Sequence, residues 1–284
     1  MVTATQARAQ FSDTTIGVRD SVTVANPGEE KGGRDVNKII ANVGHFDVWD
    51  YGTNFFNVDI LFSNANEPAN FSSGGSTEFY ALYRGQLSPD KIFGINTKFG
   101  PFTAINFEFG GDAESENSGF SPDKKLLVAG PNFNIGLPAG FLNIGVHVSK
   151  EWNNNALCTD KGAVCSPEVG APGTGGPTNF HATPELEFVW LYNLTSLTGL
   201  PLNFKGFMNI VAPKGKDGFG GKTVTEILAV PALSLDIGSY IINKPHKIEL
   251  VLSVELWQNK FGNDHTKTPG CEEISPTLGL VYHF

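Results

Sequence analysis

The stretch KIELVLSVELWQ, residues 247–258, decides the fold, because its apolar and polar side chains alternate almost without interruption. One face carries Ile248, Leu250, Leu252, Val254 and Leu256, and the other carries Lys247, Glu249, Ser253 and Glu255. Successive side chains of a β-strand point to opposite faces, so a period of two is typical of a strand and not of a helix. The stretch therefore predicts a strand with one oily face and one charged face.

The same pattern recurs along the whole chain, in segments separated by clusters of Gly, Pro, Asn, Asp and Ser. No segment sustains a helical period, and the apolar run 227–233, interrupted by Pro231, is far shorter than the roughly 20 residues of a membrane-spanning helix. Twelve strands are predicted, an even number as in single-chain bacterial barrels. They cover residues 14–24, 38–49, 53–62, 78–87, 99–109, 125–137, 141–152, 181–194, 200–211, 225–237, 247–258 and 275–284.

Alternation alone fits both a soluble β-sandwich and a transmembrane barrel, so the lengths of the connections are needed to choose. Counted from the first predicted strand, the odd connections are long and polar, for example residues 110–123 and 153–179. The even ones are mostly short, as at 50–52 and 138–140, although 88–98 and 238–246 are longer. Outer-membrane barrels alternate long extracellular loops with short periplasmic turns. The sequence thus favours an all-β, antiparallel transmembrane β-barrel of about twelve strands.

The C-terminal segment supports this choice. Leu278, Leu280, Tyr282 and the terminal Phe284 alternate with Thr277, Gly279, Val281 and His283. An amphipathic strand that ends on an aromatic residue is typical of the strand that closes an outer-membrane barrel.

Composition limits the possible partners and the number of domains. The net charge is −9 and no run of basic residues exceeds Lys124-Lys125, which argues against binding nucleic acid. We predict one barrel domain, residues 13–284, in the outer membrane of a Gram-negative bacterium. Residues 1–12, which contain Ala7-Arg8-Ala9, are predicted to be the end of an export signal or a disordered N-terminus. An oxidising compartment would permit a loop disulfide between Cys158 and Cys165, but the spacing does not decide it.

Along nearly its whole length, the chain resembles the nucleoside-specific channel-forming outer-membrane proteins, the Tsx type. The matching stretches are FDVWDYG at 46–52, FGPF at 99–102, GLP at 136–138 leading to WNN at 152–154, and GLVYHF at 279–284. The resemblance implies a narrow monomeric barrel of twelve strands that passes nucleosides by diffusion through a lumen of aromatic and ionisable side chains. This chain is poorer in Trp and Tyr than that family and carries a loop with two cysteines.

A nucleoside presents a flat base and a sugar rich in hydroxyls, so a selective passage needs rings for stacking and polar groups for the sugar. By strand parity, the predicted lumen rings are Trp49, Phe55, Tyr80, Phe207 and Trp257. The predicted polar lining is Asp47, Asn57, Asp59, Glu78, Arg84, Asn106, Glu108, Glu185, Glu187, Glu249 and Glu255. The alternative is that the charges only keep a pore hydrated, and that Trp49 and Trp257 belong to the aromatic girdle at the membrane surface.

Three other patterns resemble chemical sites, but each is expected to be part of the barrel. His147 and Ser149 resemble the pair of an outer-membrane phospholipase, but both are expected to face inward and no third group is evident, so no enzyme activity is predicted. His45 and Asp47 share a face, yet two ligands are too few for zinc, so no metal and no cofactor are predicted. The glycine-rich stretch 218–221 has no helix after it and indicates only a flexible loop.

The functional hypothesis is passive diffusion of a small polar solute, a nucleoside in particular, across the outer membrane. Two alternatives remain open at this point: a barrel that mainly displays its loops for adhesion or partner binding, and a soluble β-barrel carrier.

Overall fold

The computed structural model of the chain is a closed antiparallel barrel. It describes residues 9–27, 36–67, 74–155 and 176–284. Twelve long strands form the wall, and a two-residue strand, β8 (Thr178–Asn179), pairs only with the end of β7. The twelve are β1 (Ala9–Val24), β2 (Val36–Trp49), β3 (Gly52–Ser63), β4 (Thr77–Leu87), β5 (Phe102–Glu116), β6 (Asp123–Leu137), β7 (Gly140–Asn154), β9 (Thr183–Asn193), β10 (Leu202–Val211), β11 (Glu226–Asp236), β12 (Ile248–Gln258) and β13 (Glu272–His283).

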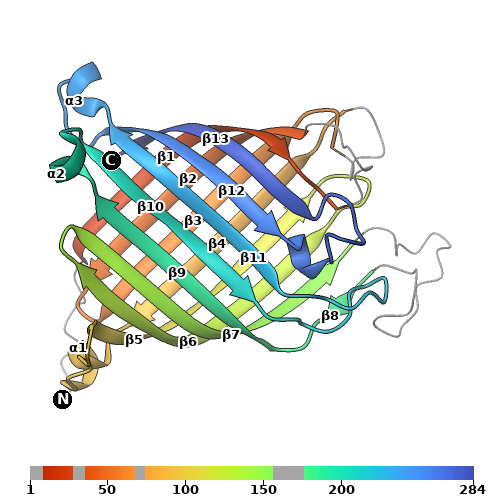
Figure 1. The fold of residues 1–284 in the computed structure, drawn as a ribbon, viewed down its shortest axis with the longest axis horizontal. Helices are drawn as coiled ribbons and strands as arrows, with labels where there is room; N and C mark the ends of the chain where they lie inside the picture. The colour runs from red at the N-terminus through yellow and green to blue at the C-terminus, as the bar shows by residue number, and fades with distance from the viewer. Residues whose placement is uncertain (1–8, 28–35, 68–73, 156–175) are drawn as a thin grey trace, which may run out of the picture.

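Each long strand pairs with the long strands next to it in sequence. The first strand, β1, pairs with the last, β13, which closes the wall and leaves the sheet without a long free edge (Figure 1). A closed barrel satisfies every backbone N–H and C=O within the sheet, which is what a bilayer requires of spanning strands.

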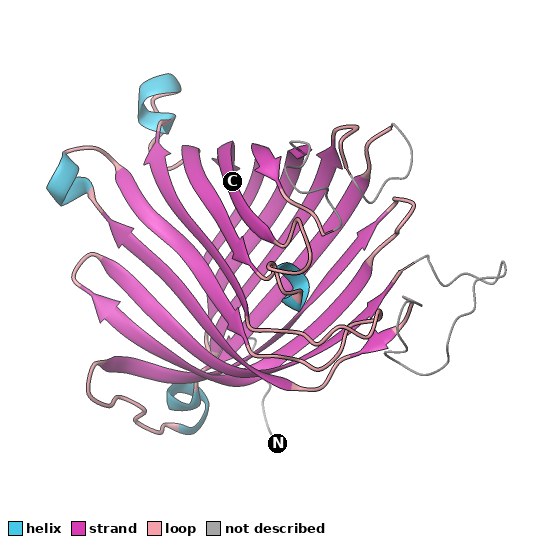
Figure 2. Ribbon diagram, turned by 45° about the vertical axis from the view of Figure 1, so that its right-hand side comes forward, coloured by secondary structure: helices cyan, strands magenta, loops and turns pink. Residues whose placement is uncertain are grey.

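The two ends of the barrel differ in the way the sequence predicts. Tight turns and three short helices, α1 (Pro89–Phe93), α2 (Thr195–Thr198) and α3 (Gly238–Ile241), lie at one end, to the left in Figure 1. Most of the longer connections lie at the other end, as Figure 2 also shows, although the β4–β5 connection at the first end, residues 88–101, is longer than the β5–β6 connection, residues 117–122. We call these the periplasmic and the extracellular end. The 153–179 loop, including Cys158 and Cys165, falls largely on residues 156–175, outside the described residues.

The arrangement of side chains is the reverse of that in a soluble carrier. Leu127, Val148 and Leu252 point outward and are 58%, 59% and 53% exposed, whereas Glu108 and Glu185 point inward and are 1% and 2% exposed. A barrel with apolar side chains on its exterior and charged side chains in its interior is stable in a lipid bilayer, whereas its exterior would be unfavourable in bulk water. The soluble-carrier alternative is therefore wrong.

All twelve predicted strands are present, and most bounds agree within a few residues. The largest difference is β5, predicted at 99–109 but observed at Phe102–Glu116, so the expected long polar loop shrinks to residues 117–122. Gly110 and Gly111 in this stretch allow close strand approach and do not make a turn, because a Cβ on Gly110 would lie 2.1 Å from the Tyr83 carbonyl oxygen.

The N-terminal boundary also moves. Ala9, Phe11 and Ser12 pair with β2, so the predicted boundary between residues 12 and 13 falls inside β1. The remainder of the predicted tail, residues 1–8, lies outside the described residues.

Candidate functional site: the charged lumen

The inner wall is lined by polar and ionisable side chains held at alternate positions of the strands. Paired residues of antiparallel strands share a face, so the register extends each assignment around the barrel. Fourteen of the sixteen predicted lumen residues lie on the inner face: Phe55, Asn57, Asp59, Glu78, Tyr80, Arg84, Asn106, Glu108, Glu185, Glu187, Phe207, Glu249, Glu255 and Trp257.

The other two predicted residues, Asp47 and Trp49, lie on the outer face. They share it with Val43, which is 43% exposed, and the β2–β3 register runs without a shift to Trp49. The prediction was wrong because the Ile39-Ile40 pair in β2 is apolar on both faces and hides the phase of the alternation. His45 and Asp47, whose Nε2 and Oδ2 atoms are 3.4 Å apart, are therefore not a lumen pair.

The structure also brings inward several charged residues that sequence reasoning missed. Asp112, Glu114 and Glu116 were assigned to a loop but continue β5 on its inner face. Lys38, Lys124, Glu151, Glu226 and Glu273 lie inward at strand ends, and Lys214 and Lys260 lie in connections between strands. Continued alternation through the polar ends of the strands is the signal that would have identified the strand residues.

An ion-pair network crosses part of the lumen around Arg84 of β4. Its Nη1 donates to Asp112 Oδ1 on β5 at 2.6 Å, and its Nε lies 3.4 Å from Glu187 Oε2 on β9. β4 and β9 are separated by three intervening strands of the wall, so the second contact spans the interior and does not run along the sheet. Arg84 therefore narrows the passage at this level.

Next to Arg84, the Glu108 carboxylate is oriented by two side-chain amides. Its Oε2 accepts hydrogen bonds from Gln86 Nε2 at 2.8 Å and from Asn132 Nδ2 at 2.6 Å. Tyr80 donates its hydroxyl hydrogen to Asp112 Oδ2 at 3.2 Å, which holds a lumen ring against the same network. Hydrogen bonds and ion pairs thus fix the orientations of the side chains in the middle of the lumen.

Buried lysines form ion pairs with carboxylates toward the extracellular end. Lys38 Nζ lies 2.8 Å from Glu78 Oε2, Lys260 Nζ lies 2.6 Å from Glu273 Oε2, and Lys214 Nζ lies 2.5 Å from Glu151 Oε2. A buried charge is tolerated only when it is paired and hydrogen-bonded, and these pairs meet that condition.

The short 3-10 helix η2 (Lys260–Gly262), between β12 and β13, places side chains over the lumen. Phe261 packs on Trp257 with 5.0 Å between ring centroids, and Lys124 of β6 lies 5.5 Å from the Phe261 centroid. Burial disfavours the charged form of Lys260, but the carboxylates of Glu273 and Glu255 outweigh it and raise its pKa above the ordinary value. Lys260 is therefore a fixed positive charge at this end.

Two further ion pairs join strands inside the lumen. Arg19 pairs with Asp59 at 2.6 Å, and Lys205 pairs with Glu249 at 2.6 Å, each pair joining strands two apart in the wall. Phe46 and Phe55 are register partners on the inner face near the β2–β3 turn, and Phe46 is a lumen ring that the sequence analysis did not identify. The lumen therefore carries ion pairs at several levels, between apolar side chains such as Ile40 and Val128.

Acidic groups outnumber basic groups on this inner surface. The described acidic side chains include Asp13, Asp59, Glu78, Glu108, Asp112, Glu114, Glu116, Glu151, Glu185, Glu187, Glu226, Asp236, Glu249, Glu255 and Glu273, against the basic Arg19, Lys38, Arg84, Lys124, Lys205, Lys214 and Lys260. The field of such a wall attracts cations and repels anions.

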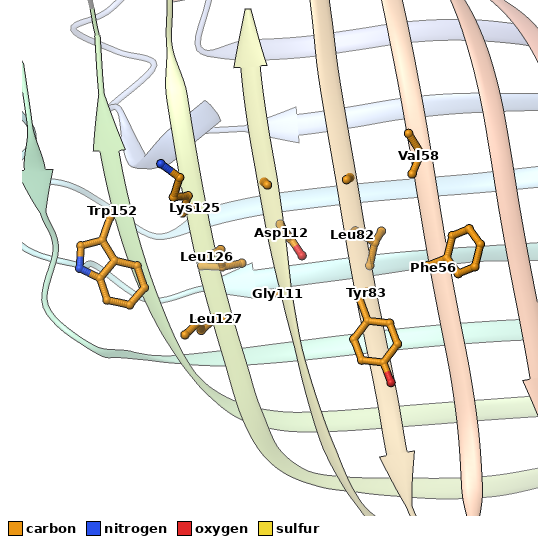
Figure 3. A pocket seen from close by; sticks show the side chains of 12 residues that line it. Phe56, Val58, Leu82, Tyr83, Gly111, Asp112, Lys125, Leu126, Leu127 and Trp152 are labelled. Carbon is orange, nitrogen blue, oxygen red and sulfur yellow. The ribbon is translucent and has the colours of Figure 1, made fainter. Parts of the chain in front are cut away.

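The outer wall carries a shallow apolar hollow that is separate from the lumen. Phe56, Tyr83, Leu127 and Trp152 line it on β3, β4, β6 and β7 (Figure 3), together with the small residues Ala81, Gly111 and Ala113. All of these residues lie on the lipid-facing side of the barrel wall.

No helix among the described residues is long and apolar enough to cross a membrane.

Comparison with known proteins gives the fold. No family model matches the chain, and no curated protein matches it. An outer-membrane channel from Pseudomonas putida F1 has a similar structure, with a TM-score of 0.50 at 8% identity over 99% of this chain and 97% of that one. The translocator domain of the autotransporter NalP from Neisseria meningitidis gives a TM-score of 0.48 at 10% identity over 98% and 90% of the two chains. The KdgM porin in complex with disordered oligogalacturonate gives 0.43 at 9% identity over 95% and 99%.

Fold and surface chemistry agree on the class of protein. A closed twelve-strand wall with an apolar exterior belongs in a bilayer, and barrels of this kind lie in the outer membrane of Gram-negative bacteria. The chain is therefore an outer-membrane β-barrel with a charged interior.

Proposed function

We propose that the protein is a passive channel for small polar solutes, with nucleosides as its specific cargo, and that it works as a monomer without catalysis. The observation that carries the proposal is the combination of rings and carboxylates on one continuous inner surface. Tyr80, Phe207 and Trp257 offer ring faces, and Asp112 and Glu226 lie beside two of these rings. Rings stack on bases, and carboxylates accept hydrogen bonds from sugar hydroxyls.

Trp257 is the ring best placed to contact a solute that enters from the extracellular end. Its Nε1 donates to Glu226 Oε1 at 2.9 Å, which fixes the orientation of the indole. Lys260 Nζ lies 4.5 Å from the ring, so the indole is held between a carboxylate and an ammonium group. A fixed ring costs less conformational entropy on binding than a mobile one, which favours selectivity.

The absence of catalysis is supported by the contacts of the one pair that suggested it. Ser149 donates its hydroxyl hydrogen to the Thr183 carbonyl oxygen at 3.4 Å, and among the described residues neither ring nitrogen of His147 has a hydrogen-bond partner, Ser149 included. A serine nucleophile needs a histidine as its base and a third group to orient that histidine. A lining role is the simpler assignment for both residues.

The test is uptake into liposomes that contain the refolded protein, with adenosine compared with a sugar matched in size. We expect faster entry of adenosine, and a several-fold smaller preference in Trp257→Leu, because stacking contributes about 1 to 3 kcal/mol per base. Trp190→Leu is the matched control, because Trp190 lies on the outer face and packs on Phe204. Equal uptake of adenosine and sugar by the unaltered protein would refute the nucleoside cargo while leaving the channel itself in place.

A further inference from the structure

Three potential metal ligands from three strands converge inside the barrel. Glu108 of β5, His147 of β7 and Glu187 of β9 each offer one donor atom, and all three atoms lie within 4.8 Å of one another. All three residues are buried, with Glu108 and His147 only 1% and 2% exposed. No other group of this kind occurs among residues 9–27, 36–67, 74–155 and 176–284.

Several donor atoms in this group have no hydrogen-bond partner. Within the described part of the chain, both ring nitrogens of His147 and the Oε1 atom of Glu108 are buried without one. A buried polar atom left without a partner is costly, and native proteins almost always satisfy it with a protein group, a water or an ion. His147 Nε2 and Glu108 Oε1 are 3.7 Å apart, so the unsatisfied atoms point toward a shared space.

The surrounding side chains hydrogen-bond to these donor groups and orient them, as the hydrogen-bond partners of metal ligands do in known metal sites. Gln86 and Asn132 both donate to Oε2 of Glu108, which leaves Oε1 available for a different partner. Arg84 Nε lies 3.4 Å from Glu187 Oε2, and Arg84 is itself held by Asp112. Such outer partners fix the direction of metal-ligating carboxylates and tune their affinity.

The cluster also carries more negative than positive charge. Glu185, 2% exposed, is the register partner of His147, so Glu108, Asp112, Glu185 and Glu187 surround a single guanidinium, that of Arg84. Several buried carboxylates with one cation repel one another strongly in a medium of low dielectric constant. A divalent cation bound between Glu108, His147 and Glu187 would balance most of this excess negative charge.

We propose that Glu108, His147 and Glu187 bind a divalent transition-metal ion of the zinc type inside the lumen. Zinc bonds of about 2.0 to 2.2 Å place tetrahedral ligands about 3.4 Å apart, so the 3.7 Å separation of Nε2 and Oε1 needs little closure. An imidazole in the ligand set favours zinc and its neighbours over calcium or magnesium, which prefer oxygen ligands. Three protein ligands leave a fourth position for water, and the ion would sit beside the Arg84 constriction.

The experiment is equilibrium dialysis of the refolded full chain against ZnCl₂, with the bound metal counted by elemental analysis. We expect one zinc ion per barrel, and an affinity lower by about tenfold or more in His147→Ala and in Glu108→Gln. His45→Gln and Glu272→Gln are the matched controls, since His45 lies on the outer face and Glu272 is exposed at the extracellular end, and both should bind zinc as the unaltered protein does.

A spectroscopic readout separates a ligand from a residue that merely supports the fold. Co²⁺ added in place of zinc should give a visible absorption band in the unaltered protein, and this band should be lost in His147→Ala even though the barrel still migrates as folded on unheated gels. No zinc binding, or binding that is the same in His147→Ala as in the controls, would overturn the proposal. Metal binding is measured without any solute flux, so its failure is distinct from failure of the nucleoside channel.

Discussion

Arginine in place of Leu252 is expected to lower the free energy of unfolding by about 2 to 4 kcal/mol, the cost of a basic side chain at the middle of a lipid-facing barrel strand. Leu252 lies near the centre of β12, is 53% exposed, and shares the outer face with its register partners Leu233 and Leu278. The penalty arises because the guanidinium must either enter hydrocarbon or draw water into it. Urea unfolding of the protein in lipid vesicles measures the change.

The control for this prediction is the next residue in the strand. Ser253 faces the lumen beside its register partner Ala232, on the same inner face as Glu249 and Glu255. Ser253→Arg places the same charge on the inner face, which also carries the carboxylates of Glu249 and Glu255, so we expect a smaller loss than for Leu252→Arg. A larger loss at Ser253 than at Leu252 would contradict the assignment of the two faces.

Removal of the Arg84 side chain, which lies inside the barrel, is expected to lower the free energy of unfolding by a comparable amount. Arg84→Ala leaves Glu187 and Asp112 buried without their cation, and breaking a buried pair in this way costs about 3 to 5 kcal/mol. The same urea experiment measures the loss. The triple variant Arg84→Ala, Asp112→Asn, Glu187→Gln should regain most of it, because the unpaired charges are then gone.

Lys205→Ala is the matched control for Arg84. Lys205 also pairs with a carboxylate in the lumen, but its side chain is 33% exposed, and ion pairs open to water contribute about 0 to 1 kcal/mol. If Arg84→Ala were as mild as Lys205→Ala, the network across the lumen would not be a structural element of the barrel.

The sequence predicts the strands well because the bilayer requires apolar side chains on the outer face of each strand, while polar side chains are allowed on the inner face. Where Leu250, Leu252 and Leu256 alternate with Glu249, Ser253 and Glu255, the phase is unambiguous and the structure confirms it. The connections at the periplasmic end follow from the short turns at 50–51 and 138–139. Fold class and most lumen residues therefore depend only on local pattern.

The errors arise where that rule weakens. At Ile39-Ile40 both faces are apolar, so the phase slipped by one and placed Asp47 and Trp49 inside. Above the hydrocarbon band, polar residues are allowed on either face, which made β5 from Gly110 to Glu116 resemble a loop. In both places the two faces of the strand do not differ in polarity, whereas elsewhere this difference identifies the lipid-facing and lumen-facing residues.

The candidate metal cluster could not be predicted from the sequence at all. Glu108, His147 and Glu187 come from β5, β7 and β9, and their convergence depends on the stagger of strands around the barrel. The prediction that no metal binds considered only His45 and Asp47, which are neighbours in one strand. Long-range register is a property of the closed barrel, and no short motif encodes it.

The most direct measurement is the zero-current potential of single channels of the refolded protein in a planar bilayer that separates two KCl concentrations. The account predicts a conducting pore that favours K⁺ over Cl⁻, because acidic side chains dominate the inner wall, with a preference that falls as the salt concentration rises. A bilayer that stays insulating, or a pore that favours Cl⁻, would contradict it.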